Sequence, residues 1–63
     1  MITYQSLYQE AIETLRESGN PDAAFDARCL MEKAFGFDRT ALSLHRDHVP
    51  EENKERYFRR LFR

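Results

Sequence analysis

Cysteine, glycine and proline are scarce in this sequence of 63 residues. It has one cysteine, two glycines, two prolines and no tryptophan. A single cysteine excludes a disulfide within the chain and favours a reducing compartment, so we expect the cytoplasm. The glycines and prolines stand at three places only, which are Gly19 to Pro21, Gly36 and Pro50. They divide the chain into a few uninterrupted segments.

Long apolar runs and an excess of one charge are missing as well. No run approaches the roughly 20 residues that span a bilayer, and charged residues interrupt the first apolar positions, which argues against a secretory signal. The net charge is -1, which does not by itself suggest a nucleic-acid-binding protein. A chain this short forms at most one domain, and it has little material for a deep pocket in addition to a core.

Apolar residues recur at helical spacing in the segments between these breaks. The first segment predicts a helix over about 4–18, with Thr3 as its N-cap. Gly19 can adopt the left-handed conformation that ends a helix. Asn20 then caps a second helix, in which Pro21 takes the first position.

The second helix should end at Phe35, because Gly36 follows it. Asp38 is a suitable N-cap for a short third helix over 39–45. Pro50 opens a fourth helix, which runs towards the end of the chain. We therefore predict an all-α fold, a small four-helix bundle with three longer helices and one short one.

The second helix carries apolar residues on two sides. At about 100° per residue, one face holds Ala23, Ala27, Leu30, Met31 and Ala34. Phe25 and Cys29 lie on the other side, so we predict that both are buried and that this helix is central, packed on both sides. Asp26, at the edge of the main face, should pair with Arg39 or with N–H groups at the start of the third helix.

A basic segment closes the sequence. Residues 54–63 hold five cations and one acid, Glu55. Four arginines at helical spacing can form a ridge that contacts a partner: Arg56, Arg59, Arg60 and Arg63. The ridge is either a solvated helix face or a contact for an acidic protein, RNA or a further domain.

No residues form a recognisable catalytic or metal site. His45 and His48 flank Asp47, but zinc needs several nitrogen or sulfur ligands, and we expect the only thiol, Cys29, in the core. We interpret both histidines as solvated loop residues. No serine has a histidine and an acid at triad-like spacing. We therefore assign no catalytic, cofactor-binding or metal-binding residue to the chain.

The segment 21–42, PDAAFDARCLMEKAFGFDRTAL, resembles the N-terminal helical domain of the HemK-like (PrmC) protein-glutamine methyltransferases. The first helix and the final RYFRRLFR look like that family's flanking helices, so the resemblance covers 1–63 as a single helical domain. The matching positions are Asp26, Ala27, Leu30, Gly36, Asp38, Arg39, Leu42, Phe58, Leu61 and Arg63.

The resemblance implies a larger enzyme that transfers a methyl group from S-adenosylmethionine to a glutamine side chain of a peptide-chain release factor. Family members carry a Gly-rich cofactor loop and an Asn-Pro-Pro-Tyr motif in a catalytic domain, and these 63 residues contain neither. The chain stops at Arg63 within an apparent helix, so we expect a catalytic domain to follow. The expected role is to recognise or position the release factor.

Two other interpretations fit the sequence. One is a stand-alone helical module for protein interaction. The other is a DNA-binding helix-turn-helix over 29–46, with Arg39, Thr40 and Ser43 available to a DNA groove. Glu32 lies where such turns usually need a small residue, and the net negative charge also argues against DNA binding.

Overall fold

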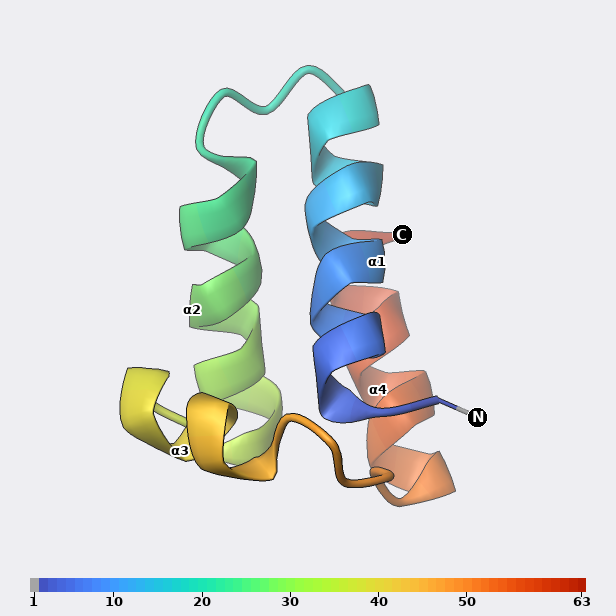
Figure 1. Cartoon of the computed structure of the whole chain (residues 1–63). Coiled ribbons are helices and arrows are strands. Elements are labelled where there is room, and N and C mark those ends of the chain that lie inside the picture. The colour runs from blue at the N-terminus through green and yellow to red at the C-terminus, as the bar shows by residue number, and fades with distance from the viewer. Residues whose placement is uncertain (1) are drawn as a thin grey trace.

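The computed structural model describes residues 2–63, which form four helices and no strand. These are α1 (Tyr4–Glu17), α2 (Ala23–Phe35), α3 (Arg39–His45) and α4 (Glu52–Phe62). Helices α1 and α2 run antiparallel side by side, α4 lies behind α1, and the short α3 crosses one end (Figure 1). The predicted all-α four-helix bundle, with three longer helices and one short one, is confirmed.

Helix α1 has the ends that the sequence predicted. The Thr3 hydroxyl accepts the N–H of Ser6 at 3.1 Å, and the Ser6 hydroxyl oxygen accepts the N–H of Thr3 at 2.8 Å. This reciprocal capping box satisfies two N–H groups that have no partner within the helix. At the other end, Gly19 takes a φ of 88°, a conformation that is strained for residues with a side chain.

Helix α2 begins at Ala23, two residues after the position that the sequence predicted. Asn20 does not cap the helix as predicted, since the N-cap is Asp22; the side-chain oxygen of Asn20 instead accepts the N–H of Asp22 at 2.8 Å. This bond closes a turn over Pro21 and Asp22 and delays the start of the helix. The prediction that Pro21 is the first helical residue is therefore wrong.

The remaining boundaries follow from two caps and one buried proline. Gly36 ends α2 with a φ of 71°, and the Asp38 carboxylate accepts the N–H of Ala41 at 2.8 Å, so α3 has its predicted bounds. Helix α4 begins later than predicted, because Glu51 is extended (φ -63°, ψ 141°) and serves as its N-cap. Pro50 stays in the connection before α4 and is buried there.

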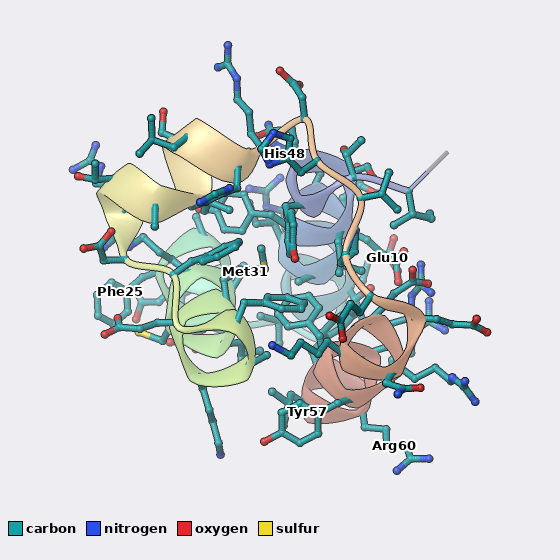
Figure 2. The ribbon with its side chains drawn as sticks, turned by 90° about the horizontal axis from the view of Figure 1, so that it is seen from below. Glu10, Phe25, Met31, His48, Tyr57 and Arg60 are labelled. Carbon is teal, nitrogen blue, oxygen red and sulfur yellow. The ribbon has the colours of Figure 1, made fainter. Side chains whose placement is uncertain are left out.

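One hydrophobic core joins the four helices. Its largest fully buried side chains are Leu7 of α1, Met31 of α2 and Phe58 of α4, and Met31 lies near the centre of the molecule (Figure 2). Helix α2 contacts both α1 and α4, while α1 contacts each of the other three helices. The buried set is Leu7, Ala11, Ile12, Ala23, Ala27, Met31, Leu42, Phe58 and Phe62.

The second side of α2 is not buried, contrary to the prediction. Phe25 is 57% exposed and lies at the outer edge of the molecule, and Cys29 is exposed too (Figure 2). A single apolar face of α2 reaches both α1 and α4, so no helix remains to cover the opposite side. Phe25 instead lies under the guanidinium of Arg28, with 5.5 Å from the guanidinium carbon to the ring centroid.

Asp26 has a different partner from the two that were predicted. Its carboxylate accepts a hydrogen bond from the side-chain amide of Asn20 at 2.6 Å. The prediction of Arg39 or an α3 N–H group is wrong, because the connection between α1 and α2 folds back over Asp26. The bond fastens that connection to the first turn of α2.

Candidate functional site

The four arginines of the predicted ridge lie on α4, but they have two different surroundings. Arg59 and Arg63 lie towards α1, where both contact Glu10. Arg60 and the neighbouring Tyr57 point away from the other helices (Figure 2). Two of the four arginines of the ridge, Arg59 and Arg63, are therefore already engaged in a contact within the domain.

Glu10 and Arg59 form a two-bond ion pair between α1 and α4. The Nε and Nη2 of Arg59 donate to the two carboxylate oxygens of Glu10 at 2.9 and 3.0 Å. Arg63 donates to the same carboxylate at 2.9 Å, and Arg59 also binds Glu55 one turn earlier on α4. The Arg59 and Glu10 side chains are only 25% and 27% exposed. This arrangement identifies Arg59 as a residue that joins two helices.

The ion pair shifts the proton affinity of both partners. The hydrogen bonds from Arg59, together with the charges of Arg59 and Arg63, hold the pKa of Glu10 below its ordinary value, although its partial burial opposes this. The hydrogen bond to Glu10 and the surrounding acids raise the pKa of Arg59. Both shifts favour the charged forms, so the pair is intact at neutral pH.

We predict that Glu10→Gln lowers the free energy of unfolding by about 1–3 kcal/mol at neutral pH, as for a charge-assisted hydrogen bond. Because the pKa of Glu10 is lower in the folded chain, its stabilisation is complete above the ordinary pKa of 4.5. It is lost as the pH falls through the lowered folded pKa. Urea unfolding at several pH values should show that the free energies of unfolding of the parent and of Glu10→Gln become equal in acid. The exposed Glu13 provides a control, Glu13→Gln, which should differ little from the parent; a constant gap for Glu10→Gln at all pH values would contradict the account.

The other half of the ridge forms an exposed surface that we call the outer strip, made of Asn53, Arg56, Tyr57 and Arg60. These residues line a shallow depression of about 190 Å³ on α4. Tyr57 is 44% exposed, which is high for an aromatic residue. Arg56 has only a 3.6 Å ion pair with Glu52, and both of these side chains are largely exposed. The outer strip therefore combines two solvent-facing cations with an accessible ring.

The two histidines differ in their surroundings: His48 is exposed, as expected of a solvated loop residue, whereas His45 is the last residue of α3 and is partly buried. His45 stacks on Phe37 with 5.0 Å between ring centroids, and the Nδ1 atoms of His45 and His48 lie 3.1 Å apart, within hydrogen-bonding distance. Residues 2–63 contain no group of three or more His, Cys, Asp or Glu side chains that could hold a metal ion. In the same range, no helix combines the length and the apolar composition needed to cross a bilayer.

A family model named PrmC N-terminal domain matches residues 6–63. The chain belongs to this family. The match begins in the first turn of α1 and extends beyond α4, so it covers the bundle except for the first two residues of α1. The resemblance to an N-terminal domain of a PrmC/HemK-like methyltransferase is thereby confirmed. No curated protein and no solved structure matched the chain.

Membership of the PrmC N-terminal domain family bears on the two other interpretations. A stand-alone interaction module and a helix-turn-helix were both compatible with the helical pattern, but the matched family is named for part of a larger enzyme. In this PrmC domain, Arg39, Thr40 and Ser43 are exposed, as the helix-turn-helix interpretation required. Contact of these residues with DNA stays a prediction.

Proposed function

We propose that this PrmC N-terminal domain helps to recognise or position a peptide-chain release factor for methylation of a glutamine side chain. The observation that carries this proposal is the family match over residues 6–63, which include parts of all four helices. The methyl donor would be S-adenosylmethionine, and a catalytic domain of the same enzyme would supply its site. The exposed thiol of Cys29 supports a reducing compartment, so we place this activity in the cytoplasm.

The residues of this chain do not fit a site for S-adenosylmethionine. A cofactor loop needs glycines where a side chain would collide with the ligand or with a neighbouring segment. Both glycines, Gly19 and Gly36, end helices with positive φ, and a Cβ atom at either position would meet no atom within 4 Å. Both glycines allow the chain to change direction after a helix. We assign no chemical step to this domain.

The outer strip is the surface that we assign to the release factor. Tyrosine and arginine are enriched at protein interfaces, because they combine a large contact area with hydrogen bonding. Tyr57, Arg56 and Arg60 offer these groups around one depression on α4. Tyr57 and Arg60 lie at the outer edge of the molecule (Figure 2). Arg59 and Arg63 also stay candidates for partner contact, although both guanidinium groups already bind Glu10.

A positioning role predicts a particular kinetic effect. The outer strip would hold the release factor equally in the ground state and the transition state, so its loss raises KM without changing kcat. We expect the double substitution Arg56→Glu and Arg60→Glu, made in the complete enzyme, to raise KM for folded release factor by up to about tenfold. The Kd for S-adenosylmethionine should stay constant.

Two comparisons make this experiment specific. Arg16→Glu with Lys33→Glu changes the charge equally at exposed positions of α1 and α2, and it should leave KM unchanged. If the outer strip packs on the catalytic domain instead, the Arg56 and Arg60 substitutions would lower the melting temperature of the enzyme and leave KM unaltered. An unaltered KM together with an unaltered melting temperature would show that the strip is a solvated surface.

A further inference from the structure

A second basic surface lies at the other side of the domain, between α1, α2 and α3. It is a groove of about 250 Å³, which we call the α1–α3 groove. Three arginines from three different parts of the chain surround it, and Leu42 and Tyr8 supply apolar surface. The lining residues are Gln5, Tyr8, Arg28, Arg39, Leu42, Ser43 and Arg46.

The positive charge of this groove is hardly neutralised. Within residues 2–63, the ion pairs give Arg28 and Arg39 no carboxylate partner, and Arg46 has only a 3.9 Å contact with Asp47 between two largely exposed side chains. Arg59 of α4, by contrast, binds two carboxylates. Three arginines therefore line one hollow in a chain whose net charge is -1.

Arg39 lies at a position where helix energetics do not favour a cation. It is the first residue of α3, where the helix dipole is positive and repels a guanidinium. Asp38 caps the helix by accepting the N–H of Ala41. The stability of α3 therefore gives no reason for an arginine here, whereas an anionic partner at the groove would.

The walls of the groove are held in place before any partner arrives. Arg28 stacks over the ring of Phe25, and the Tyr8 hydroxyl donates to the carbonyl oxygen of Ala24 at 3.3 Å. Leu42 is a buried core residue. A site that is already ordered loses less conformational entropy on binding.

We propose that the α1–α3 groove binds an acidic segment of a partner protein. Carboxylate side chains of that segment would pair with Arg28, Arg39 and Arg46, since guanidinium and carboxylate groups match in shape and charge. The aliphatic parts of the segment would lie on Tyr8 and on the small part of Leu42 that is exposed. The volume is below the roughly 300–1,000 Å³ of small-molecule sites, so the groove suits one or two side chains.

A protein segment fits better than a nucleic acid. Proteins that bind single strands present aromatic faces on which bases stack. The only aromatic lining residue, Tyr8, is half buried, with its hydroxyl bound to the α2 backbone. The proposal is independent of the release factor contact assigned to α4, because it concerns other residues and its test measures no methyl transfer.

The test is a fluorescence anisotropy titration of the 63-residue chain against a short labelled peptide in which glutamates alternate with alanine and leucine. Saturable binding that weakens with added salt is expected. Backbone amide NMR signals of Arg39 and Ser43 should shift during the same titration. Arg28→Gln with Arg39→Gln should weaken binding at least about threefold, as for two exposed charge contacts. Arg16→Gln with Lys33→Gln, outside the groove, should leave the affinity unchanged.

Arg39→Gln alone separates binding from folding. It should weaken peptide binding while the melting temperature stays the same or rises, because a cation leaves the start of α3. The same titration is repeated with two further probes, which are a peptide with glutamine in place of glutamate and a single-stranded RNA of equal charge. The proposal is overturned by absence of peptide binding, by equal binding of the glutamine peptide, by tighter binding of the RNA through the same arginines, or by full affinity in the double variant.

Discussion

Phe58→Ala is expected to lower the free energy of unfolding by about 3–5 kcal/mol, the usual cost of truncating a buried aromatic side chain. Phe58 is fully buried, and its ring lies 5.1 Å from that of Phe62 and 5.5 Å from that of Phe35, measured between centroids. A domain of this length has a total stability of roughly 3–9 kcal/mol. The variant should therefore lose about a third of that stability or more, and circular dichroism should show a markedly lower melting temperature.

Tyr57→Ala is the matched control for Phe58→Ala. It removes a ring of similar size from the preceding position of the same helix, but Tyr57 is 44% exposed whereas Phe58 is fully buried. Its effect should stay within about 0.5 kcal/mol, as for most surface substitutions. Equal losses for the two variants would contradict the way that α4 packs on the bundle.

Met31→Ala should cost about 2–5 kcal/mol, because it leaves a cavity at the centre of the core. Met31 is fully buried on the face of α2 that contacts α1 and α4. Urea unfolding should show a lower midpoint with an unchanged slope, which indicates that stability alone has changed.

Phe25→Ala tests the opposite side of α2 and is the comparison for Met31→Ala. The lost contact is an exposed stack with Arg28, worth about 0.5–1 kcal/mol. If Phe25→Ala destabilised the domain as much as Met31→Ala, then α2 would be packed on both sides, and the exposed position of Phe25 would be wrong.

The helices themselves could be predicted because their signals are local. Thr3, Asp38 and the two glycines act on neighbouring backbone groups, so their roles follow from a few adjacent residues. The later starts of α2 and α4 could not be predicted. The side chain of Asn20 closes a turn instead of capping a helix at Pro21, and Pro50 is buried in a connection. At both positions the same residues could form either the first turn of a helix or a different local structure. They form a turn before α2 and an extended connection before α4.

The error over Phe25 and Cys29 has a general cause. Periodicity shows that α2 has apolar residues on two sides, but it does not show how many helices are available to cover them. Much of a folded protein's surface is apolar, so an uncovered phenylalanine is compatible with a stable fold. In a bundle this small, α1 and α4 share one face of α2, and the other face stays exposed.

The candidate sites depended on contacts between distant residues. Helical spacing placed four arginines on one side of α4, but the partner that occupies two of them, Glu10, lies 49 positions before Arg59. Arg28, Arg39 and Arg46 of the α1–α3 groove come from α2, from the start of α3 and from the residue after α3. The packing of both α2 and α3 against α1 brings that set together, and no sequence spacing indicates it.

The most direct test of the proposed role compares two substrates with two enzymes. The complete enzyme and a form without residues 1–63 would each methylate a folded release factor and a short peptide that contains the target glutamine. Our account predicts that removal of the domain lowers kcat/KM for the folded release factor by about tenfold or more, while kcat/KM for the peptide stays the same. An equal loss with both substrates, or no loss with the release factor, would contradict a role for this domain in positioning the release factor.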